Sequence, residues 1–69
     1  MSAKKNVLKV KLFVSIERGD TEEVREIIQR YPEFVNLTAS HRWTPILFAV
    51  RYGYLDIVKL LVENGASLD

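Results

Sequence analysis

Residues 44–66 read TPILFAVRYGYLDIVKLLVENGA and predict two short helices with a turn between them. Thr44 belongs to the residue types that cap helix N-termini, and Pro45 suits the first helical position because its missing N–H would lack a partner there anyway. We expect this helix to cover residues 46–52 and to end at Gly53.

The second helix of this stretch is expected over residues 55–64. Its apolar residues stand at positions 57, 58, 60, 61 and 62, among Asp56, Lys59 and Glu63, which is a helical spacing. Gly65 follows, and glycine is the usual residue where a helix ends in a left-handed conformation. The stretch therefore predicts one helix-turn-helix unit.

The same unit occurs earlier in the chain. At an offset of 34 residues Gly19 falls on Gly53 and Val24 on Val58. The flanking apolar positions also match, since Leu12, Phe13, Val14 and Ile16 fall on Ile46, Leu47, Phe48 and Val50, and Ile27 and Ile28 fall on Leu61 and Val62. Periods near 33 residues are typical of stacked repeats. We expect one domain over residues 1–69, with a first repeat at 1–36 and a second at 37–69.

In the first repeat, Asp20 and Glu23 are spaced as a capping box at the start of a helix that Pro32 ends. Residues 9–16 fit a strand or a helix when taken alone, and the repeat register favours a helix. Residues 36–43 show no helical period and predict a turn-rich loop between the repeats.

The composition limits what so short a chain can do. It has 69 residues, ten Lys and Arg, nine Asp and Glu, and no cysteine, which excludes disulfides and thiolate metal sites. His41 is the only histidine, so we expect no metal, no cofactor and no enzymatic activity. The sequence contains no run of about 20 apolar residues, the length that spans a membrane. We expect a cytoplasmic location.

The basic residues gather at the start of the chain. The first eleven residues carry Lys4, Lys5, Lys9 and Lys11, which are expected to form a solvated cap. Nucleic-acid binding through these lysines is the less favoured alternative, because a formal net charge of +1 is low for such a domain.

The second repeat resembles an ankyrin repeat. Thr44-Pro45-Ile46 is similar to the family's Thr-Pro-Leu opening, and residues 57–66 are similar to its second helix and closing Gly-Ala. Residues 7–36 resemble the degenerate repeats that begin such arrays. Three positions depart from the family pattern, namely Leu47 and Tyr54, where histidine is usual, and Arg42, where glycine is usual.

The resemblance implies an all-α solenoid of two helix-turn-helix repeats joined by a hairpin-like loop, with a protein-binding surface. Matched residue by residue, it implies partner-binding roles for Ser40, His41, Trp43, Arg51, Tyr52 and Asn64. The indole of Trp43 is either an exposed anchor or folded onto Phe13 or Phe48. The hydroxyls of Tyr31, Tyr52 and Tyr54 are expected to stay hydrated.

The apolar residues of the second repeat's last helix cover two of its sides. We expect the chain to form a homodimer through a self-association face made of Ile57, Leu60, Leu61 and Val62. The alternative is that the other helix of the same repeat covers most of this surface. A second hypothesis is that the chain is a fragment, or an engineered minimal form, of a longer array without a function of its own.

Overall fold

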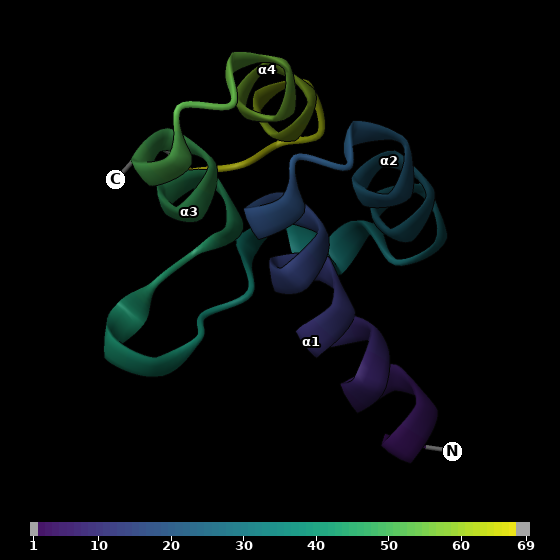
Figure 1. The fold of residues 1–69 in the computed structure, drawn as a ribbon. Helices are drawn as coiled ribbons and strands as arrows, with labels where there is room; N and C mark the ends of the chain where they lie inside the picture. Colours follow the sequence, from purple (N-terminus) through teal and green to yellow (C-terminus); the bar gives the residue numbers. More distant parts are fainter. Residues whose placement is uncertain (1, 68–69) are drawn as a thin grey trace.

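The computed structural model describes residues 2–67, with the side chains of Ser2, Ala3 and Ser40 outside the described part. Its helices are α1 (Ser2–Arg18), α2 (Thr21–Arg30), α3 (Pro45–Tyr52) and α4 (Leu55–Glu63), with short 3-10 helices at Pro32–Asn36 and Ser40–Arg42. The α1–α2 pair stacks on the α3–α4 pair, with α1 against α3 and α2 against α4 (Figure 1). The all-helical, two-repeat architecture is confirmed.

The two helix pairs turn in the same way. Gly19 and Gly53 have φ values of +74° and +75°, a left-handed conformation that glycine adopts without a steric penalty. The N–H of Asp20 donates to the carbonyl of Ser15 at 2.9 Å, and the N–H of Tyr54 donates to that of Ala49 at 3.0 Å. The repeat seen in the sequence is therefore present in the hydrogen bonds.

The helix starts follow the predicted caps with one correction. Thr44 Oγ1 accepts from the N–H of Leu47 at 3.3 Å, and Asp20 Oδ1 accepts from the N–H of Glu23 at 3.2 Å. A capping box also requires the Glu23 carboxylate to accept a hydrogen bond from the N–H of Asp20, and this half of the prediction was wrong. The N–H of Asp20 serves the turn, and the carboxylate of Glu23 forms an ion pair with Lys11 at 3.2 Å instead.

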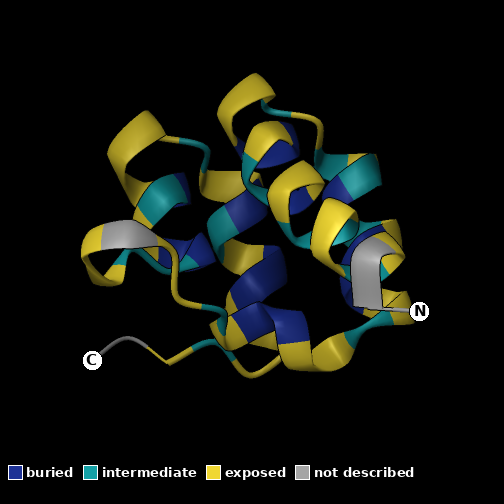
Figure 2. Ribbon diagram, turned by 90° about the horizontal axis from the view of Figure 1, so that it is seen from below, coloured by how far each residue is buried: buried dark blue, intermediate teal, exposed yellow. Residues whose placement is uncertain are grey.

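One apolar core joins the two pairs (Figure 2). All four α-helices and the 3-10 helix Pro32–Asn36 contribute buried side chains: Leu12, Ile16, Val24, Ile27, Ile28, Phe34, Val35, Ile46, Ala49, Ile57, Leu60 and Leu61. The predicted self-association face is corrected here, because Ile57, Leu60 and Leu61 are buried within a single chain. Helix α4 packs against both α3 and α2, which cover these residues, so Val62 alone of the four is exposed.

A different apolar face stays open on the second repeat. Leu47, Val50 and Val62 are 42%, 58% and 44% exposed. Their counterparts at the 34-residue offset are Phe13, which packs edge-on against Phe48, and Ile16 and Ile28, which are fully buried. We call Leu47, Val50 and Val62 the end face, since all three are exposed and their counterparts in the first repeat are half-buried or buried.

The start of the chain belongs to α1, where Lys4 and Lys11 are exposed, as expected of a solvated cap, and Lys5 is half-buried. The ammonium of Lys5 lies 2.8 Å from a carboxylate oxygen of Glu33 and over the rings of Tyr31 and Phe34, at 5.6 and 5.9 Å from their centroids. The hydrogen bond of this pair raises the pKa of Lys5 and lowers the pKa of Glu33. The pair ties α1 to the 3-10 helix that follows α2.

Candidate functional site

A loop of residues 37–43 projects from the helices between the two repeats (Figure 1). The N–H of Ala39 donates to the carbonyl of Trp43 at 2.7 Å and closes it into a hairpin-like turn. His41 and Arg42 have φ values of 60° and 63°, and both side chains are exposed. Arg42 thus adopts a left-handed conformation at the position where the family usually has glycine.

Four aromatic rings run from the end of this loop along α3 to the start of α4. Their centroids are 5.8 Å apart for Trp43 and Phe48, 5.5 Å for Phe48 and Tyr52, and 6.1 Å for Tyr52 and Tyr54. We call Trp43, Phe48, Tyr52 and Tyr54 the aromatic row. Trp43 combines the two alternatives left open above, because its ring meets Phe48 edge-on while remaining only half-buried.

Polar groups fix the aromatic row at both ends. The guanidinium of Arg51 lies 5.6 Å from the centroid of the Trp43 ring, within cation–π range. The Tyr52 hydroxyl donates to the Glu17 carboxylate at 3.3 Å, and the Tyr54 hydroxyl donates to the Glu17 backbone carbonyl at 3.2 Å. These two hydroxyls were expected to stay hydrated, and both bonds to Glu17 lie in exposed positions. Burial, and then the negative charge of Glu17, raise the pKa of Tyr52.

The structure groups only part of the predicted partner-binding set. Trp43, Arg51 and Tyr52 lie in or beside the aromatic row. His41 stands in the loop, and the side chain of Ser40 lies outside the described residues. Asn64 lies apart from the aromatic row, at the end of α4. Its side-chain amide donates to the carbonyl of Leu60 at 2.8 Å and caps this helix.

Sequence reasoning missed Glu17 as a member of this arrangement, and it named Phe48 only as a possible contact of the Trp43 ring. Phe48 and Tyr52 stand four residues apart on one helix, a spacing that places their rings on one face and could have signalled the row. Glu17 offers no such local signal, because its bond to Tyr52 joins residues 35 positions apart.

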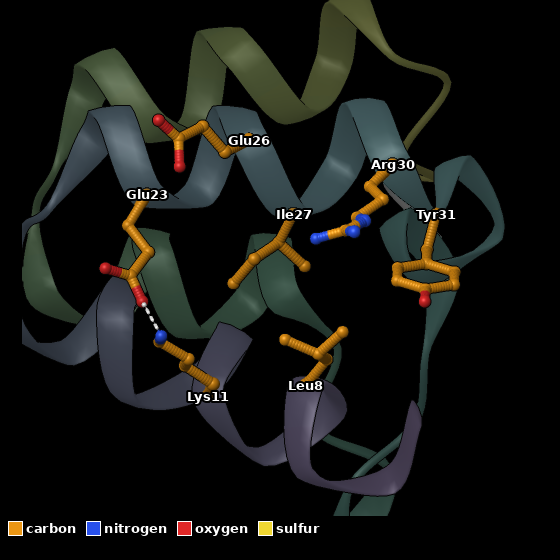
Figure 3. A pocket seen from close by; sticks show the side chains of 7 residues that line it. All are labelled: Leu8, Lys11, Glu23, Glu26, Ile27, Arg30 and Tyr31. Carbon is orange, nitrogen blue, oxygen red and sulfur yellow. Dashed lines mark ion pairs between the residues drawn. The ribbon is translucent and has the colours of Figure 1, made fainter. Parts of the chain in front are cut away.

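A small cleft of about 140 Å³ lies between α1 and α2 (Figure 3). Leu8, Ile27 and Tyr31 give it an apolar side, and its charged lining comes from Lys11, Arg30, Glu23 and Glu26. It is smaller than the roughly 300 Å³ at which ligand pockets begin, and its opposite charges balance. Within residues 2–67 no group of three or more His, Asp or Glu side chains is placed to hold a metal ion.

The family description "Ankyrin repeats (3 copies)" matches residues 5–69. The chain belongs to the ankyrin repeat family. The part of the chain that the structure describes holds two of the family's helix pairs. None of the helices in this part is long and apolar enough to cross a membrane.

Three curated relatives illustrate the range of the match. Ankyrin repeat and SAM domain-containing protein 6 of Mus musculus is 36% identical over 58 residues, 84% of this chain and 7% of that protein. NAD-capped RNA hydrolase NUDT12 of Homo sapiens is 32% identical over 71 residues, 97% of this chain and 15% of that protein. NAD-dependent deacetylase sir2B of Dictyostelium discoideum is 35% identical over 57 residues, 83% of this chain and 7% of that protein.

The ankyrin chain therefore spans between 7% and 15% of the length of these relatives. Two of them are named for enzymatic activities, which are activities of those whole proteins. No solved structure matches the chain.

Proposed function

We propose that this ankyrin chain is a non-enzymatic protein-binding module whose contact surface is the aromatic row together with the loop of residues 37–43. The observation that carries the proposal is the accessible Trp43–Phe48–Tyr52 arrangement with the Arg51 guanidinium over the indole at cation–π distance. Trp, Tyr and Arg are the residue types most enriched where interfaces concentrate their binding energy.

The arrangement is also pre-organised. Each ring of the row contacts the next, and the hydroxyls of Tyr52 and Tyr54 are held by Glu17 of α1. Side chains that are already fixed lose little conformational entropy when a partner covers them. A protein partner is favoured over a small molecule, because the row lies on an open helix face and the loop rather than in a cleft.

Site-specific photo-cross-linking tests this surface. A photoreactive benzophenone amino acid replaces Arg51 in one variant and Lys59, an exposed residue of α4, in the control. We expect a discrete protein adduct from position 51 that is lost in the Trp43→Ala background and is absent from position 59. Equal adducts from both positions, or an adduct that ignores Trp43→Ala, would refute the aromatic row as the binding surface.

Self-association is a second candidate function, and the end face is the observation that favours it. Leu47, Val50 and Val62 stay exposed, whereas the equivalent residues of the first repeat are the half-buried Phe13 and the buried Ile16 and Ile28. A second copy related by a two-fold axis would cover this face on both chains. The residues involved differ from those expected from the sequence, since only Val62 is common to the two sets.

Sedimentation equilibrium across a hundredfold range of concentration tests the dimer. We expect a concentration-dependent dimer that Val50→Glu converts to a folded monomer. Val10→Glu on α1 is the matched control, because Val10 is similarly exposed, and it should leave the dimer intact. A monomer at every concentration would exclude the dimer and leave the end face to a further repeat of a longer array. Location in the cytoplasm and the absence of a cofactor remain predictions.

A further inference from the structure

Helix α1 carries a second exposed apolar surface, at the opposite end of the stack from the end face. Val7, Val10 and Val14 are 63%, 65% and 44% exposed. Their spacing of three and four residues places them on one side of α1, away from the buried Leu12 and Ile16. We call the three residues the valine stripe, and it lines a shallow groove of about 430 Å³.

The valine stripe has the spacing of a coiled-coil seam. With Val7 and Val14 at position a of a heptad, Val10 occupies position d. The neighbouring e positions are then Lys4, Lys11 and Arg18, which are seven residues apart and all basic. A β-branched residue at a suits a two-stranded coiled coil, and charged e positions select the partner helix.

The charges beside the stripe are only partly compensated within the chain. Lys11 pairs with Glu23 of α2 at 3.2 Å, whereas Lys4 and Arg18 form no ion pair among the described residues. The half of α1 that carries Lys4 and Val7 extends away from α3 and α4 (Figure 1). A helix lying along the stripe would meet the positive charges of Lys4 and Arg18 on one flank, with the Lys11–Glu23 pair between them.

Two possible occupants fit this face poorly. A further ankyrin repeat would need apolar residues on α2 as well, but Glu23 and Glu26 stand where the second repeat has Ile57 and Leu60. A second copy of the chain would bring basic e positions together in an antiparallel pair. In a parallel pair it would place them against Asn6 and Phe13, which carry no negative charge.

We propose that the valine stripe binds an acidic amphipathic helix of a partner protein. The apolar residues of that helix pack on the three valines, and its glutamate or aspartate side chains lie opposite Lys4, Lys11 and Arg18. This surface shares no residue with the aromatic row or the end face. It can therefore fail without affecting the proposed function, and the reverse also holds.

The probe is a synthetic helix of about three heptads with leucine at a and d and glutamate at e and g. A second peptide, with lysine at e and g, is the control. We expect the acidic peptide to bind the full chain, to weaken as salt is raised, and to shift the NMR signals of the three valines. Val10→Ser should weaken it roughly tenfold, the loss expected when a buried valine is removed.

Leu55→Ser on α4 is the matched control, because Leu55 is exposed and belongs to none of the proposed surfaces, and it should leave the peptide affinity unchanged, with circular dichroism confirming that both variants are folded. The double variant Lys4→Glu, Arg18→Glu should exchange the preference and bind the basic peptide better. Equal binding of both peptides, or no effect of Val10→Ser, would overturn the proposal. So would adsorption to phosphatidylserine vesicles without peptide binding, because the stripe would then be a membrane-surface site.

Discussion

Gly19 and Gly53 occupy the same turn in the two repeats with nearly the same φ, yet the space beside them differs. A Cβ built on Gly19 would lie 3.1 Å from two ring carbons of Tyr54, whereas a Cβ on Gly53 would meet nothing within 4 Å. Gly19 is therefore favoured for two reasons, the left-handed turn and the close approach of the Tyr54 ring.

This difference predicts unequal costs for the same substitution. Gly53→Ala should lower the free energy of unfolding by about 1–2 kcal/mol, the cost of a left-handed alanine. Gly19→Ala should cost about 1 kcal/mol more because of the contact with Tyr54. Urea unfolding of both variants measures the difference, which should disappear in a Tyr54→Ala background. Equal costs in the native background would show that the contact relaxes freely.

Tyr54 replaces a residue that is usually histidine in the family and makes its own bond between repeats. Tyr54→Phe removes the hydroxyl that donates to the Glu17 carbonyl, so we expect a loss of about 0.5–1 kcal/mol in the free energy of unfolding. Tyr31→Phe is the control, because the Tyr31 hydroxyl has no hydrogen bond within residues 2–67. If the two variants unfold at the same urea concentration, the Tyr54 bond contributes nothing to stability.

The Lys5–Glu33 pair joins two elements, and its effect on stability should depend on pH. The pKa of Glu33 is lowered in the folded chain, so its contribution is present above the ordinary pKa of a glutamate and is lost as pH falls through the folded value. The pKa of Lys5 is raised, so its contribution is lost only as pH rises through the alkaline range.

We therefore expect Glu33→Gln to lower the melting temperature slightly at pH 7 and to have almost no effect at about pH 2, well below the ordinary glutamate pKa of about 4.3. Both side chains are about half exposed, which keeps the change small. Thermal unfolding of wild type and variant at the two pH values measures it. A difference that persists at the lower pH would mean that Glu33 acts through packing rather than charge.

Helix α4 shows which elements follow from local sequence and which do not. Its start, its end and its turn at Gly65 are confirmed to within one residue, because caps and glycines act over a single turn. Which side of α4 is covered depends on α2 and α3, so the sequence misplaced Ile57, Leu60 and Leu61 on an open face. The positions in the loop of residues 37–43 were predicted from the family resemblance. The hydrogen bonds to Glu17 were not predicted, because they depend on contacts between the two repeats.

Leu61 and Val62, two adjacent residues of α4, differ in burial. Leu61→Ala should lower the free energy of unfolding by about 2–5 kcal/mol, because Leu61 is fully buried. Val62→Ala should change it by no more than about 0.5 kcal/mol in the monomer. Chemical unfolding at low protein concentration measures both. A large cost for Val62→Ala under those conditions would mean that the end face is covered within one chain.

At the scale of the whole molecule, neither repeat has a core of its own. Buried residues of both repeats, including Leu12, Ile28, Ile46 and Ile57, belong to one cluster. Asn36, at the end of the first repeat, also binds the second, since its amide donates to the carbonyl of Gly65 at 3.3 Å and its oxygen accepts from the N–H of Ser67 at 2.9 Å. The two repeats should therefore fold as one unit.

Cutting the chain between the repeats tests that unit. Synthetic peptide 37–69 should show little helicity, because α3 and α4 have only 8 and 9 residues and helices of this length are marginal in water without packing, whereas peptide 1–36 should keep part of the helicity of α1, which has 17 residues. Mixing the peptides should restore helicity in proportion to complex formation, as measured by circular dichroism.

Leu61→Ala in the second peptide should abolish the gain in helicity, whereas Leu55→Ala, at an exposed position, should not. A peptide 37–69 that is fully helical alone would show that the second repeat folds by itself, and the single domain over residues 1–69 would be wrong.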